Sequence, residues 1–170
     1  SGYRGQVKFN TTDFMEDGVT PEETVAVCGM LAKEGVTAVE FSGGSRYGSR
    51  NSLPPGKIAL GPDEGYYRDA AKLYKDNVAV PLILVGGIRS VAGAANILEE
   101  GLADAIAFSR PFIREPDFPA RWRTGAADVT TCISCSLCHK DGRGHANVHC
   151  EVDDRKKGVR EQRACRYCGR

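Results

Sequence analysis

The chemistry most clearly indicated by this 170-residue sequence is metal binding by cysteine. Six of the seven cysteines follow residue 131, and four of them form the pattern Cys132-x2-Cys135-x2-Cys138-x11-Cys150. Thiolates at this spacing suit a [4Fe–4S] cluster or a zinc ion. A cysteine cluster beside a cysteine-poor region favours metal binding in a reducing compartment over a secreted disulfide scaffold, so we expect a cytoplasmic protein.

A second close pair, Cys165-x2-Cys168, offers an alternative ligand set. Together with Cys135 and Cys138 it could form a four-thiolate zinc site. A histidine could also replace one thiolate, and three lie in this region: His139, His145 and His149. Reduced, unligated thiols in a tail are the remaining interpretation. The seventh cysteine, Cys28, stands alone in a predicted helix and is expected to be a buried structural thiol.

Two segments further upstream could bind a phosphate group. Gly86 and Gly87 follow a strongly apolar stretch, and Ser109-Arg110 follows the next one. Glycine lets the backbone approach a ligand closely, and backbone donors at the start of a helix favour anions. Ligands of parallel α/β folds sit at the carboxyl ends of the strands. The alternative is that the glycines only form a tight turn and the arginine pairs elsewhere.

The elements that must position these residues are four strand-then-helix units. Strands are predicted at residues 6–10, 37–41, 81–85 and 105–108. Helices are predicted at 21–34, 64–76 and 91–100, and short ones near 110 and at 117–123. This alternation indicates a parallel sheet with right-handed crossovers. Periodicity alone does not separate an open sheet from part of a β/α barrel.

Charge and hydropathy argue against two classes of function. The formal net charge is +1, so no global charge favours nucleic acid or a membrane surface. No apolar run approaches the ~18–20 residues that a membrane span needs. The long loop at 45–62 could be a functional lid, with Arg46, Tyr47 and Arg50 as ligand contacts or, as we slightly favour, solvated residues. Trp122 is expected to be a packing anchor.

The ordered segments 81–90, 101–104 and 108–111 resemble the C-terminal half of the Old Yellow Enzyme family. That family consists of FMN-dependent NAD(P)H:flavin oxidoreductases and enoate reductases. Segments 7–14, 39–44 and 65–71 extend the resemblance, which covers about residues 5–150. The cysteine pattern resembles the iron–sulfur branch of the family, such as 2,4-dienoyl-CoA reductase. It departs from that branch in one respect, because two residues rather than three precede the third cysteine.

The resemblance implies residue roles. Lys8 would approach the N1 side of the flavin ring and stabilise its reduced anionic form. The FMN phosphate would be held by Gly86, Gly87, Ser109 and Arg110, where the family usually has glycine in place of the serine. A [4Fe–4S] cluster, with zinc as the alternative, would be held by Cys132, Cys135, Cys138 and Cys150, and less readily by Cys165 and Cys168.

The resemblance also implies that the family's first four strands have no counterpart here. We therefore expect a four-unit half of a TIM-type β/α barrel over residues 5–125 and a metal-binding tail over 126–170, with no assignable catalytic residue and poor activity alone. Flavin would carry hydride from NAD(P)H to an activated alkene or related small-molecule acceptor. The exposed sheet edges predict self-association or pairing with the missing half-barrel. The alternatives are a non-catalytic module with a zinc tail and a sugar-phosphate-binding barrel fragment.

Overall fold

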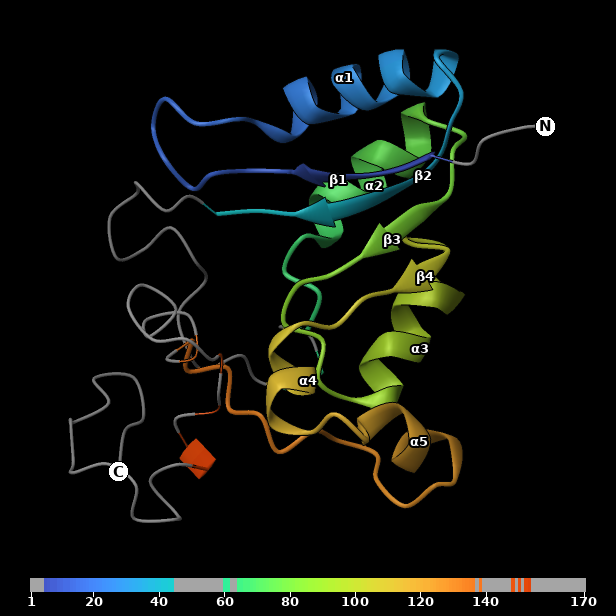
Figure 1. Cartoon of the computed structure of the whole chain (residues 1–170). Helices are drawn as coiled ribbons and strands as arrows, with labels where there is room; N and C mark the ends of the chain where they lie inside the picture. Colours follow the sequence, from blue (N-terminus) through green and yellow to red (C-terminus); the bar gives the residue numbers. More distant parts are fainter. Residues whose placement is uncertain are drawn as a thin grey trace.

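The computed structural model (Figure 1) describes residues 5–44, 60–61, 64–136, 138, 148, 150 and 152–153. The predictions for most of the long loop, for the three histidines of the tail, and for Cys165 and Cys168 fall outside these residues. Among the described residues the predicted alternation of strands and helices is confirmed. The elements are β1 (Gly5–Asn10), α1 (Pro21–Lys33), β2 (Val36–Ser42), α2 (Arg68–Asn77), β3 (Leu82–Leu84), α3 (Val91–Glu99), β4 (Ala105–Ile106), α4 (Arg110–Arg114) and α5 (Phe118–Arg123).

The four described strands form one parallel sheet in the order β1-β2-β3-β4. Because all four run the same way, their carboxyl ends meet at one edge. Figure 1 shows this edge directed towards the segment that carries the first cysteines, drawn in orange. Strands β1 and β4 form the outer edges within the described sheet. Closure of these units with others into a barrel stays a prediction.

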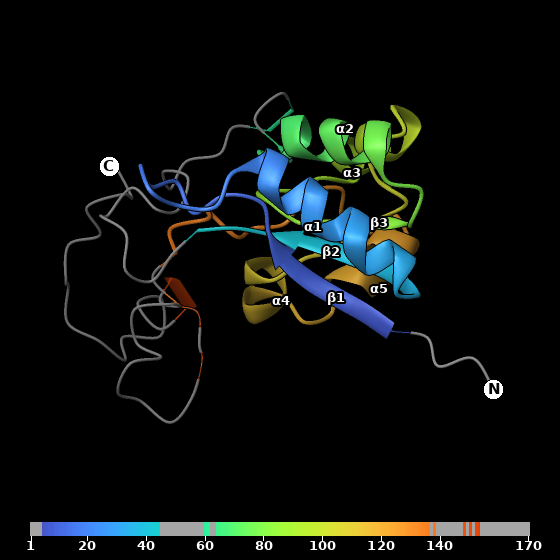
Figure 2. The ribbon, with the colours of Figure 1, turned by 90° about the horizontal axis from the view of Figure 1, so that it is seen from above.

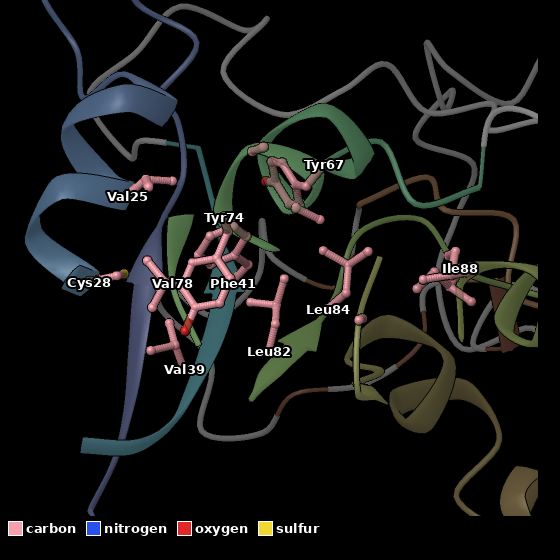
Figure 3. Packing of buried hydrophobic residues seen from close by; sticks show 14 of the residues in the cluster. Val25, Cys28, Val39, Phe41, Tyr67, Tyr74, Val78, Leu82, Leu84 and Ile88 are labelled. Atoms are coloured by element: carbon pink, nitrogen blue, oxygen red, sulfur yellow. The ribbon is translucent and has the colours of Figure 1, made fainter. Parts of the chain in front are cut away.

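The core lies between one face of the sheet and helices α1 to α3 (Figure 3). Alternate residues of the central strands, such as Phe41 and Leu84, point into it and are fully buried. Figure 2 shows α2 and α3 together on one side of β1 and β2. The expected burial of Cys28 in α1 is confirmed, and Tyr74 of α2 is fully buried as well. Each apolar side chain of this size contributes about 1.5–3 kcal/mol on burial.

Helix α1 begins where the sequence predicts. The Thr20 side chain accepts a hydrogen bond from the Glu23 amide, and the Glu23 carboxylate accepts one from the Thr20 amide. This capping box, with proline at the first helical position, satisfies amides that the helix leaves unpaired.

The predicted start of α2 at residue 64 is wrong. The helix begins at Arg68, because Gly65 has a φ of 71° and breaks the helical path. Glu64 lies before that break and is fully buried. Its carboxylate instead accepts hydrogen bonds from the Arg89 and Ser90 amides, which precede α3.

The beginning of the tail pairs with the turn after β3. The Thr130 amide donates to the Arg89 carbonyl at 2.8 Å, and the Val91 amide donates to the Asp128 carbonyl at 2.8 Å. Ser90 and Val129 form an antiparallel bridge between them. The segment that leads into Cys132 is therefore held against the turn that carries Gly86 and Gly87.

Candidate functional site

The turn after β3 has the backbone that close approach to a ligand requires. Gly86 and Gly87 have φ values of 131° and 71°, which side chains rarely permit. A Cβ on Gly86 would lie 2.8 Å from the Cδ2 atom of Tyr67. Within the described residues, the Gly87 amide donates to no protein acceptor. The turn therefore offers a backbone donor at the carboxyl edge of the sheet.

The second predicted segment lies beside this turn. Leu84 of β3 pairs with Ile106 of β4, so the residues that follow each strand share the same edge. Ser109 precedes α4 without a capping hydrogen bond from its side chain, and its amide has no acceptor in the described part of the chain. The structure thus places Gly86, Gly87 and Ser109 at the same edge of the sheet, and their contact with a phosphate stays a prediction.

Arg110 has partners within the protein, as the alternative interpretation expected, although the sequence did not indicate which residues they are. Its Nη1 atom donates to the Ser134 carbonyl at 3.2 Å and to the Ser136 hydroxyl at 2.7 Å. Both serines have positive φ values, 55° and 56°, a conformation that costs about 1 kcal/mol or more for a non-glycine residue. Arg110 therefore holds the strained cysteine segment, and its contact with a phosphate stays a prediction.

Lys8 lies on the face of the sheet opposite the helices. Its ammonium pairs with Glu40, the residue directly across from it on β2, at 2.5 Å. The Lys8 side chain is 54% exposed. The lysine thus has a partner within the protein, and its charge remains on the open face of the sheet.

Glu64 is a residue of this site that sequence reasoning missed. Its buried carboxylate accepts hydrogen bonds from the Arg89 amide at 2.5 Å and from the Ser90 amide at 2.7 Å. It also accepts from the Ser90 hydroxyl at 2.5 Å and from the Gly61 amide at 3.1 Å. A carboxylate at the start of α3 is favourable because the helix dipole presents positive charge there. Glu64 therefore fixes the end of the glycine turn.

An aromatic cluster closes the same edge of the sheet. The rings of Tyr66 and Tyr67 lie 4.5 Å apart edge to face, and Phe14 stacks on Tyr67 at 6.1 Å. Burial raises the pKa of Tyr67, and neighbouring Tyr66 raises it further, so the phenol stays protonated. A Cβ on Gly43 would come within 2.5 Å of the Tyr67 hydroxyl, so glycine is required there for the ring to fit.

The four cysteines of the main pattern line one cavity of about 20 Å³. They are Cys132, Cys135, Cys138 and Cys150, and Arg110 and Arg114 lie in the same wall. Burial raises the pKa of Cys138 to about 11, and the neighbouring thiols raise it while Arg110 opposes the rise. Burial likewise raises the pKa of Cys132. The four cysteines of the sequence pattern therefore line the same cavity in the structure.

The cavity has the chemistry of a metal site but is not arranged as a finished one. In the described part of the chain, no three or more His, Cys, Asp or Glu side chains are placed closely enough to hold an ion. The donor set nevertheless fits a thiophilic metal, because four thiols face one space and two guanidinium groups can offset the charge of their thiolates. The predicted ligands therefore fit the group by type and line one cavity, and their binding of a metal stays a prediction.

Residues 6–128 match the model of the NADH:flavin oxidoreductase / NADH oxidase family. The chain belongs to this family. An NADH oxidase of Thermoanaerobacter brockii is 31% identical over 142 residues, which is 83% of this chain and 21% of that protein. A 4,4'-dithiodibutanoate disulfide reductase of Rhodococcus erythropolis is 25% identical, over 77% of this chain and 39% of its own length. The chain thus spans about a fifth to two fifths of these curated relatives.

Solved structures support the fold. A 2-naphthoyl-CoA reductase complex aligns with a TM-score of 0.61 at 22% identity, covering 76% of this chain and 19% of that one. An Old Yellow Enzyme homologue from Zymomonas mobilis aligns with a TM-score of 0.50 at 22% identity, covering 74% and 32%. The chain is accordingly an α/β fragment of the type found in these proteins. Among the described helices, none has the length and apolar character to cross a membrane.

Proposed function

We propose that this chain is the FMN-phosphate half of an oxidoreductase that carries hydride from NAD(P)H to an activated alkene or a related acceptor. Membership of the flavin oxidoreductase family supports the flavin and the nicotinamide reductant. The observation that carries the proposal is the pair of adjacent strand ends whose backbone donors have no acceptor among the described residues. Gly87 and Ser109 present backbone amides there, beside a turn whose glycines have positive φ.

The residues of this chain would bind and orient the cofactor rather than react with the substrate. The Gly86–Gly87 turn and Ser109 would donate backbone N–H groups to the phosphate, and Arg110 would add charge. Lys8 would present its ammonium to the N1 side of the ring, with Glu40 holding the side chain on the open face. When bound, flavin supplies hydride transfer. The substrate anchor and the proton donor would come from the other half, so the chain alone would be a poor catalyst.

We also propose that the four-thiol cavity holds a metal, preferably a [4Fe–4S] cluster and alternatively zinc, as in the iron–sulfur branch of the family. Cys132, Cys135, Cys138 and Cys150 would be the ligands. Their shared cavity and the adjacent guanidinium groups support this assignment. A cluster there would exchange single electrons with the flavin, whereas zinc would only stabilise the tail.

The deciding experiment is a visible spectrum of anaerobically purified chain after incubation with FMN and gel filtration, with iron and zinc quantified in the same sample. Retained flavin bands support the FMN assignment, and Gly86→Ala should lose them because its Cβ would meet Tyr67. Gly29→Ala is the matched control, because a Cβ there meets nothing within 4 Å. Elution of the chain free of flavin would overturn the FMN assignment. Bound iron with a broad visible absorbance indicates the cluster, and bound zinc alone indicates the structural tail.

The two outer strands support a further part of the proposal, that the chain associates through its sheet. β1 and β4 each pair on one side only within the described sheet, and unpaired strand edges favour pairing with another chain. We propose that residues 5–125 form a half-barrel that pairs with a second copy or with its missing half, and that 126–170 form the tail. Light scattering over a dilution series tests this, and a monomer at all concentrations would contradict self-association.

A further inference from the structure

We propose that Arg114 is the positioning residue that joins the two separate parts of the four-cysteine set. This inference rests on the proposed metal site. Three of the cysteines lie together at 132–138, and the fourth lies at 150, beyond a long connection. Something must bring Cys150 to the other three, and the contacts of Arg114 do so.

Arg114 reaches both parts of the set. Its Nε atom donates to the Thr131 hydroxyl at 2.7 Å, next to Cys132 in the sequence. Its Nη1 atom donates to the Cys150 sulfur at 3.4 Å and pairs with Asp153 at 3.2 Å. The Arg114 side chain is only 7% exposed. A single buried guanidinium therefore holds the chain on both sides of the long connection.

Neighbouring groups keep this arrangement rigid. Glu115 is buried and accepts hydrogen bonds from the Thr131 amide at 2.6 Å and from the Thr130 hydroxyl at 3.2 Å. It also pairs with Arg121 of α5. One helical turn before Arg114, Arg110 holds the segment between the first three cysteines. Helix α4 thus carries two arginines on the side that faces the cysteines.

The chemistry of guanidinium explains why arginine occupies this position. Its planar fork offers five N–H donors in fixed directions, so one side chain can bind a hydroxyl, a sulfur and a carboxylate at once. Lysine offers a single charged centre on a flexible stem and cannot reproduce this geometry. A hydrogen bond and a positive charge at a ligand sulfur also raise the reduction potential of a bound cluster. Arg114 would therefore set both ligand position and potential.

The test compares Arg114→Gln and Arg114→Lys with Arg123→Gln, a control on the exposed side of α5. The full chain is reconstituted anaerobically with ferrous iron and sulfide and, in parallel, with Zn²⁺. Loss of a partner that orients metal ligands typically weakens metal binding about 10–100-fold. We expect such a loss for both Arg114 variants, a more negative cluster potential in any iron-loaded variant, and no change in the control.

A second readout needs no metal. Mild oxidation of the metal-free chain, mapped by peptide mass spectrometry, reports whether Cys150 forms disulfides with Cys132, Cys135 or Cys138. The parent chain should form them, and Arg114→Gln should not. If Arg114→Gln fails to fold by circular dichroism, Asp153→Asn removes one contact on the Cys150 side and should reduce the same cross-links in part.

The outcomes separate the two proposals. A parent chain that takes up neither iron nor zinc overturns the metal site. The disulfides formed by the parent chain and by Arg114→Gln still test the role of Arg114 in that case. Unchanged metal binding and unchanged cross-links in a folded Arg114→Gln chain overturn the role of Arg114, whatever metal the parent chain holds.

Discussion

Replacing Glu64 with alanine should be among the most destabilising single changes in this chain. The carboxylate is fully buried and accepts four hydrogen bonds, two of them from the amides of Arg89 and Ser90. Two more come from the Ser90 hydroxyl and from the Gly61 amide. Alanine removes all four acceptor contacts and leaves buried donors at the start of α3 without partners.

The expected cost follows from these contacts. A hydrogen bond to a charged group is worth about 1.5–3 kcal/mol, and an unsatisfied buried donor costs about 1–3 kcal/mol. The four contacts are not additive, and removing the charge recovers the cost of burying it. We therefore expect Glu64→Ala to lower the free energy of unfolding by about 3–5 kcal/mol. Since domains of this size have about 5–15 kcal/mol in total, the variant should be marginally folded.

The assay is urea unfolding followed by far-ultraviolet circular dichroism. Glu99→Ala is the matched control, because Glu99 is exposed at the end of α3. This substitution should change the free energy of unfolding by less than about 0.5 kcal/mol. Glu64→Gln keeps one acceptor oxygen and should fall between the two. A Glu64→Ala chain as stable as the control would refute the assignment of this carboxylate as the anchor of the glycine turn.

Three further changes test the packing and the charges. Gly43→Ala should lower the free energy of unfolding by about 1–3 kcal/mol, measured by urea unfolding, because the new Cβ would press on the Tyr67 hydroxyl. Phe41→Ala should cost about 3–5 kcal/mol in the same assay, because the ring is fully buried. Burial acts to raise the pKa of Asp104, but hydrogen bonds from Lys75 and a backbone amide lower it below the ordinary 3.8. Ionised Asp104 therefore contributes its full stabilisation above pH 3.8, and this contribution is lost as the pH falls through the folded-state pKa. In Asp104→Asn the free energy of unfolding should depend less on pH in the acid range, as measured by circular dichroism.

Local signals predicted much of the fold. The Thr20–Glu23 capping box places the start of α1, and the apolar run at 81–85 places β3, because both depend on neighbouring residues alone. The sequence places Glu64 in a helix, because nothing next to it shows that its partners lie 25 and 26 residues away. The ion pair of Lys8 with Glu40 was missed for the same reason, since it needs the register of two strands.

The candidate sites show the same difference between local patterns, which the sequence predicts, and long-range contacts, which it does not. The spacing of the cysteines predicted one cluster, and the structure places four of them around one cavity. The contacts of Arg114 with residues on both sides of the long connection have no signature in the sequence. An arginine after a strand predicts a charge at the sheet edge, but not which of its donors turns towards another segment. The pattern of residues in the sequence therefore does not predict long-range contacts between polar side chains.

Arg110 belongs to both of the proposed sites, and its contacts are compatible with both proposed roles. Only its Nη1 atom is used to hold Ser134 and Ser136; within the described residues, Nε and Nη2 donate to no protein acceptor. Burial raises the pKa of Tyr67, and the charge of Arg110 opposes that rise, so the guanidinium lies within electrostatic reach of the ring that packs on Gly86. Because guanidinium carries five donors, one side can hold the cysteine segment while the other donates to a further acceptor. A phosphate bound there would then be linked through a single side chain to the position of the thiols.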